Sequence, residues 1–197
     1  MTRPPVPADP VSPPAVEHLL SFDVEEYFHV EAAAARLPRE QWEVLEKRLP
    51  ASVDRLLALL DGHQVRATFF VLGWVARREP EVVRRISEAG HEVASHGMTH
   101  AMLHRIGAEA FRAELADSRK LLEDLSGLPV RGYRAPTFSI THRTAWALDV
   151  LADEGFAYDS SIFPVRHDRY GVPEAPRFAH MAVGPSGGRI LEIPPLT

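Results

Sequence analysis

The sequence predicts an α/β fold. Short runs rich in β-branched and aromatic residues alternate with longer segments whose apolar residues recur every three or four positions. This alternation is typical of parallel strands joined by helical crossovers. Periodicity leaves two arrangements open, an open doubly wound sheet and a closed or distorted barrel.

The segments with strand character are short and end in turn residues or acids. The run "VRATFFVLG" is the clearest of them, because it is dense in β-branched and aromatic residues. The predicted strands are residues 18–25, 65–73, 91–97, 130–136, 156–161 and 189–195.

The predicted helices lie between these strands. They are residues 52–63, 80–90, 107–127 and 141–155. Pro80 begins the second helix and Gly90 ends it, in the positions that favour these residues. The third helix has an apolar face that consists of Phe111, Leu115, Ser118, Leu122 and Leu125.

Composition limits the function. With 197 residues and 45% hydrophobic content, the chain is large enough for one domain with its own core. A formal net charge of -5 implies no basic face, so we expect no nucleic-acid partner. The absence of cysteine excludes disulfides, zinc–thiolate sites and cysteine nucleophiles.

The first 17 residues differ from the rest of the chain. Six of the first 14 are proline, so residues 1–17 are predicted to be a disordered tail and residues 18–197 the domain. This tail has no continuous apolar run of the kind that a signal peptide needs. No segment is long and apolar enough to span a membrane. We therefore expect a cytoplasmic protein; the sequence does not indicate its oligomeric state.

Polar side chains gather where the predicted strands end. The acids at 23, 25 and 26 close the first strand, His96 the third, Arg134 the fourth and Asp159 the fifth. In both arrangements of the fold, the carboxyl ends of parallel strands form the functional site. We therefore expect these groups to converge there.

His96 and His100 are the pair that first suggests a metal. Their spacing would place both imidazoles on one side of a helical turn, although ten histidines in the chain make some such pairs expected by chance. Alternation along the first strand points Asp23 and Glu25 to the same side, so Glu25 is a better candidate than Glu26 to share a site with Asp23.

Two imidazoles, one carboxylate and an open position make a hydrolytic metal site. The ion lowers the pKa of a bound water to about 7 and polarises a carbonyl oxygen. A second carboxylate can remove a proton from that water, and an arginine beside it can hold this base ionised and in place. The sequence supplies a candidate for each of these roles.

Four segments, "SFDVEEYFHV", "RATFFVLGWVA", "HEVASHGMTH" and "RGYRAPTFSIT", resemble in order and spacing those of the polysaccharide deacetylases. This is carbohydrate esterase family 4, also called the NodB-homology domain. The resemblance covers residues 18–197. It is nearest to the bacterial branch whose first motif reads Asp-Val-Glu, found beside exopolysaccharide and exosortase-linked gene sets.

The resemblance implies roles for the converging groups. Asp23 matches the catalytic base, Arg134 the arginine that holds it, and Glu25, His96 and His100 the metal ligands. The implied cofactor is one divalent ion, zinc before cobalt, nickel or manganese. A glutamate ligand two residues after the base departs from the commonest family pattern, in which two aspartates are adjacent.

Three further residues take roles from the same resemblance. The backbone amide of Thr137 matches an oxyanion donor, Tyr133 is assigned with it to oxyanion or substrate contact, and Asp159 matches the acid that orients a later catalytic histidine. The implied fold is a distorted (β/α) barrel of seven strands. Because no Leu-x-His pattern occurs before Thr197, we expect the domain to be incomplete at its C-terminus.

The predicted function is metal-dependent removal of N-acetyl groups from amino sugars of an exopolysaccharide or cell-wall glycan. Two alternatives stay open. One is a hydrolase of other C–N bonds on the same scaffold, such as those of cyclic ureides or imides. The other is a non-catalytic relative that retains the metal and binds glycans.

Overall fold

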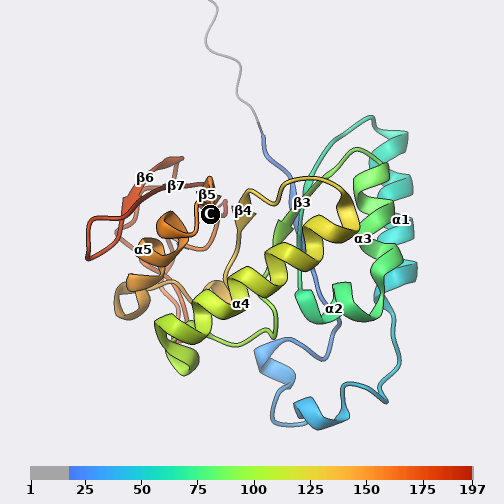
Figure 1. Cartoon of the computed structure of the whole chain (residues 1–197), viewed down its shortest axis with the longest axis horizontal. Coiled ribbons are helices and arrows are strands. Elements are labelled where there is room, and N and C mark those ends of the chain that lie inside the picture. The colour runs from blue at the N-terminus through green and yellow to red at the C-terminus, as the bar shows by residue number, and fades with distance from the viewer. Residues whose placement is uncertain (1–17, 197) are drawn as a thin grey trace, which may run out of the picture.

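The computed structural model describes residues 18–196 and confirms the α/β fold. Its strands form one seven-stranded sheet with the order β1-β2-β3-β4-β5-β7-β6 (Figure 1). In the part of the chain that the structure describes, β1 and β6 are the two ends of this sheet. The predicted tail, residues 1–17, lies outside the described residues.

The strands are shorter than predicted, and all but one pair are parallel. Their bounds are β1 Ser21–Val24, β2 Thr68–Val71, β3 Glu92–Ser95, β4 Gly132–Tyr133, β5 Tyr158–Asp159, β6 His180–Val183 and β7 Arg189–Glu192. The exception is the pair of β6 and β7, which run antiparallel. The sequence predicted only parallel strands and missed β6.

The helices follow the predicted order, with one addition. Their bounds are α1 Leu49–Gly62, α2 Gly73–Arg78, α3 Pro80–Glu88, α4 Leu103–Ser126 and α5 Trp146–Asp153. The addition is α2, which follows β2 directly. Short 3-10 turns occupy Glu31–Ala33, Arg39–Gln41, Pro136–Phe138 and His142–Thr144.

The core lies between the sheet and the helices. Helix α4 crosses the molecule (Figure 1) and contacts α2, α3, α5 and β3. The apolar face predicted for this helix is confirmed: Leu125 is partly buried and the other four residues are fully buried. Ser118 fits in this face because its hydroxyl is hydrogen-bonded to Ser95 of β3 at 2.8 Å. None of the described helices has both the length and the hydropathy to cross a membrane.

Candidate metal-dependent hydrolytic site

A cavity of about 550 Å³ lies at the carboxyl ends of β1 and β3. Five of the predicted site residues line it: Asp23, Glu25, His96, His100 and Thr137. The structure therefore brings together side chains that are more than 100 positions apart in the sequence. Strand β1 ends at Val24, and Asp23 and Glu25 face the same cavity, as alternation predicted.

The two histidines come from a loop and not from a helical turn, so that part of the prediction was wrong. Strand β3 ends at Ser95, and the loop after it turns back through Gly97 and His100, which have φ angles of 76° and 58°. Both angles lie in the left-handed region, which a continuous helix does not use. The loop sets the ring centroids of His96 and His100 5.3 Å apart.

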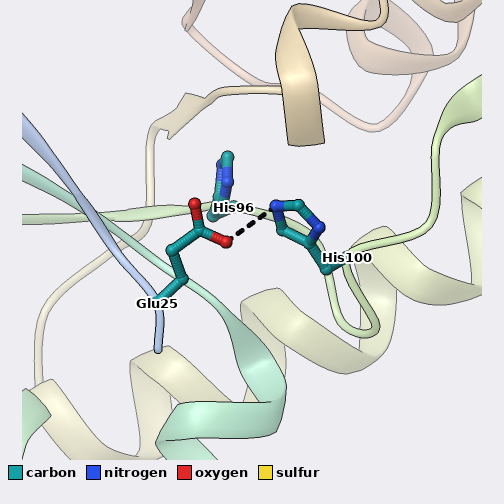
Figure 2. Close-up of side chains that lie close together, drawn as sticks. All are labelled: Glu25, His96 and His100. Atoms are coloured by element: carbon teal, nitrogen blue, oxygen red, sulfur yellow. Dashed lines mark ion pairs between the residues drawn. The ribbon is translucent and has the colours of Figure 1, made fainter. Parts of the chain in front are cut away.

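Glu25, His96 and His100 form the one cluster of potential metal ligands found among the described residues. One ligand atom from each lies within 4.8 Å of the others. The Glu25 Oε2 atom is 2.8 Å from His100 Nε2, and Figure 2 shows the carboxylate of Glu25 directed between the two rings.

Several features of this cluster fit a divalent ion. Nδ1 of His96 is 2.9 Å from the carbonyl oxygen of Arg134, which can only accept, so Nδ1 carries the hydrogen and Nε2 has a free lone pair. Burial lowers the pKa of His96, which favours the neutral imidazole that a metal requires. The Glu25 Oε2 atom is buried without a hydrogen-bond donor. Two imidazoles and one carboxylate are a common donor set for zinc.

Glu26, the alternative that the sequence left open, lies outside the cluster of potential metal ligands. Its carboxylate is buried and accepts hydrogen bonds from the backbone N–H groups of Arg48, at 2.9 and 3.1 Å, and Leu49, at 3.1 Å. These donors are at the start of α1, where backbone N–H groups have no partner within the helix. Glu26 therefore caps α1 from a distance.

Arg134 holds Asp23 at the wall of the cavity. Its Nη1 donates to Asp23 Oδ1 at 2.8 Å, and its other guanidinium nitrogens donate to Ser21 and Ser160. The guanidinium lies 4.1 Å from the centre of the Phe70 ring. Because four of these five contacts are hydrogen bonds in fixed directions, the arginine has one available orientation and so does the carboxylate that it holds.

Thr137 and Tyr133 were predicted together, but the structure places them apart. Thr137 lies in a turn with φ 54° and ψ 29° and lines the cavity. Tyr133 is buried in the core, where its ring packs against Phe111 and Phe156. It does not line the cavity that contains Asp23 and the histidines.

Comparison with known proteins identifies the family. The family model for polysaccharide deacetylases matches residues 42–157, which is more than half of the chain. The chain belongs to the polysaccharide deacetylase family. A second model, for a domain of unknown function (DUF3473), matches residues 160–197.

Relatives with assigned names include two deacetylases. The chain is 35% identical over 103 residues to a chitooligosaccharide deacetylase from Rhizobium leguminosarum bv. trifolii, which covers 52% of this chain and 45% of the relative. It is 30% identical over 96 residues to a peptidoglycan-N-acetylglucosamine deacetylase from Bacillus cereus, which covers 48% and 35%. The matched segments thus span less than half of each relative.

A solved structure matches nearly the whole chain. A protein from Mycobacterium smegmatis, assigned as a polysaccharide deacetylase, superposes with a TM-score of 0.71 and 28% identity. The match covers 96% of this chain and 63% of that one. In the family match, His96, His100 and Arg134 are included, whereas Asp23 and Glu25 precede residue 42. The last two join the site through the geometry of β1.

Asp159 of this family member faces the helices and does not line the cavity. Its side chain is fully buried and accepts a hydrogen bond from the Ser161 hydroxyl at 2.5 Å. Burial raises its pKa, and the same cause raises that of Glu192, the neighbouring carboxyl group on β7. Asp159 Oδ2 and Glu192 Oε2 are both buried without a hydrogen-bond partner, so burial and the second acid nearby favour the protonated form of these groups. The sequence analysis missed Glu192, although an acid within the apolar run "RILEIPP" was the available signal.

His29 also escaped the sequence analysis. It is buried and its ring stacks with that of His100 at an interplanar angle of 24°, with centroids 6.2 Å apart. Its Nδ1 accepts a hydrogen bond from the backbone N–H of Glu26, and burial lowers its pKa to about 3. This neutral imidazole also makes edge contacts with the rings of Trp42 and Trp74, so it is part of the packing beside His100.

Proposed function

We propose that this protein is a metal-dependent hydrolase that removes N-acetyl groups from amino sugars of a glycan. The observation that supports this most directly is the arrangement within one cavity. A cluster of three potential metal ligands lies beside a carboxylate, Asp23, that is held by Arg134 and is not itself part of the cluster. The names of the relatives point to N-acetylated glycans.

Glu25, His96 and His100 would hold the ion, and zinc suits this donor set best. When bound, a divalent ion supplies Lewis acidity toward the acetyl carbonyl and toward water. In the segment "FDVE", the proposed ligand Glu25 follows the proposed base Asp23 by two residues. The family branch with this Asp-Val-Glu order is linked to exopolysaccharide systems, so we propose an exopolysaccharide as the glycan.

Asp23 accepts the proton of the water that attacks the acetyl carbon. Arg134 cannot take that proton, because a guanidinium remains protonated, and it fixes the carboxylate so that one oxygen stays available to the cavity. The bond between carbon and nitrogen then breaks and releases acetate and an amine. The proton taken from water balances the one that the leaving amine gains.

Thr137 is the residue proposed to stabilise the negative charge that develops on the carbonyl oxygen. The left-handed turn at Thr137 brings this residue to the cavity wall, where its backbone N–H is the proposed donor. Donors that are fixed before the reaction stabilise such charge without reorganisation.

The test is acetate release from N-acetylglucosamine oligomers by the metal-loaded protein, beside the Asp23→Asn variant. We expect release by the wild type and a rate about 10²–10⁴ times lower in the variant, with unchanged metal content. Ring opening of cyclic ureides in place of acetate release would contradict the proposal. Glycan binding with full metal content and no turnover would also contradict it.

A further inference from the structure

A second cavity borders the one described above. It has a volume of about 500 Å³, within the range that holds small ligands. The two cavities share a wall formed by Glu31 and by residues 167–170. A chain of linked sugars that occupies the first cavity would therefore reach the second without leaving the protein surface.

Apart from Glu31, the shared wall belongs to a loop, residues 163–172, whose backbone is fixed at its base. The carbonyl oxygen of Phe163 accepts hydrogen bonds from the N–H groups of Val165 and Val172, both at 2.8 Å. Gly171 has φ 102°, and a Cβ at this position would lie 2.2 Å from the carbonyl oxygen of Val165. Only glycine fits here, so the loop closes tightly.

Aromatic stacking makes the same loop rigid. The ring of Tyr170 stacks with those of Phe163 and His167, at interplanar angles of 4° and 11°. Phe138 packs against both Phe163 and Tyr170. These ring contacts, together with the hydrogen bonds at its base, favour one conformation of the loop.

The second cavity is more basic than the chain as a whole. Its lining contains three arginines, two histidines and two acids, whereas the whole chain has 27 acids against 22 lysines and arginines. The titratable lining residues are Glu31, His104, Arg105, Arg143, His167, Asp168 and Arg169.

Neighbouring acids account for only part of this charge. Arg105 pairs with Glu31 at 2.6 Å, and Asp168 lies 3.0 Å from His167 and 4.0 Å from Arg169. Arg143 forms no hydrogen bond or ion pair with the residues that the structure describes; it lines the cavity and is exposed. Arg143 is therefore a cation that is free to bind a ligand.

We infer that the second cavity binds an acidic sugar, one with a carboxylate, next to the N-acetylated sugar in the same glycan. The inference rests on the proposed function for the identity of the first sugar. A planar guanidinium matches a carboxylate through two parallel hydrogen bonds, which makes Arg143 the selective contact. The substrate class is thus a glycan in which an N-acetylated amino sugar is linked to a uronate.

The experiment compares two ligands that differ only in charge. One is the tetrasaccharide of hyaluronan, in which N-acetylglucosamine alternates with glucuronate, and the other is the same tetrasaccharide with its carboxyl groups reduced to alcohols. Binding is measured by calorimetry at low and high salt, and acetate release is measured in parallel. We expect the acidic form to bind about tenfold more tightly at low salt, with the advantage reduced at high salt.

Variants assign the selectivity to Arg143. Arg143→Gln should bring the two affinities to within about twofold of each other, because one charged hydrogen-bonding contact is lost. Arg55→Gln removes an exposed arginine from α1, away from both cavities, and should keep the wild-type ratio.

The possible results separate this inference from the proposed function. Equal affinity of the wild type for both tetrasaccharides, or an unchanged ratio in Arg143→Gln, would overturn the acidic subsite even if acetate is released. Selective binding of the acidic form without acetate release would support the subsite and contradict the proposed deacetylase.

Discussion

Substitution of Glu25 and Glu26 should separate metal binding from stability, although the two residues are adjacent. Glu26 accepts hydrogen bonds from two backbone N–H groups at the start of α1 and is 3% exposed. Glu25 has no such donors, and its Oε2 atom faces His100. Removal of Glu26 should therefore destabilise the fold, and removal of Glu25 should abolish metal binding.

The expected magnitude for Glu26→Ala follows from these contacts. A hydrogen bond to a charged group contributes about 1.5–3 kcal/mol. Two backbone N–H groups lose the Glu26 carboxylate as their acceptor, so the variant should be less stable by about 3 kcal/mol or more. For a domain of this size that is a fall in melting temperature of about 6–12 °C. Glu26→Gln keeps Oε1, which both donors reach, and should cost only about 1 kcal/mol.

The assay is thermal unfolding of metal-free protein beside elemental analysis after metal loading. Glu25→Gln should lose the ion while the metal-free protein unfolds within about 1 kcal/mol of the wild type, because the amide keeps the size of the side chain and replaces a carboxylate oxygen that is buried without a hydrogen-bond donor. Glu26→Gln should keep the ion. Full metal content in Glu25→Gln, or metal loss in a folded Glu26→Gln, would refute the assignment.

Three further predictions follow from the same geometry. Loss of an outer hydrogen-bond partner of a metal ligand lowers metal affinity by about 10–100-fold. His96→Ala removes a proposed ligand itself, so its metal affinity should fall further, as elemental analysis would show. Asp23→Ala should lower the free energy of unfolding by about 1–3 kcal/mol, measured in urea, because the buried guanidinium of Arg134 loses its carboxylate partner. Burial raises the pKa of Glu192 above its ordinary 4.5, so the folded state keeps a proton that the unfolded state has lost. Stability should then fall as pH rises from 4.5 toward the raised pKa, and Glu192→Gln should lessen that slope in unfolding measured across pH.

Most of the fold could be predicted from local patterns. The apolar face of α4 follows from its spacing, and Pro80 marks the start of α3 as predicted. Strand β6 was missed because its pattern is weak: in "HMAV" only Ala182 is buried. Its pairing with β7 depends on contacts with the neighbouring strand, which local sequence does not encode.

The site was partly predictable for a related reason. The carboxyl ends of parallel strands meet at one edge, so acids and histidines that follow strands could be grouped from their positions in the sequence. The loop conformation that joins His96 to His100 could not be predicted, because their four-residue spacing is also that of a helix. The His167–Tyr170 wall has no periodicity, and only its packing around Phe163 reveals it.

The register of the sheet explains why the side chains of Asp159 and Tyr133 do not line the cavity that Asp23 lines. Asp23 pairs with Phe70, which pairs with Ala94, so these three side chains share one face of the sheet. Ser95 is the next residue of β3 and points to the other face, where it meets α4. Tyr133 pairs with Ser95, and Asp159 pairs with Tyr133, so both point toward the helices. The position of a residue at the end of a strand is readable from the sequence, but its face depends on the register of every strand between it and the site, and a shift of one residue would reverse it.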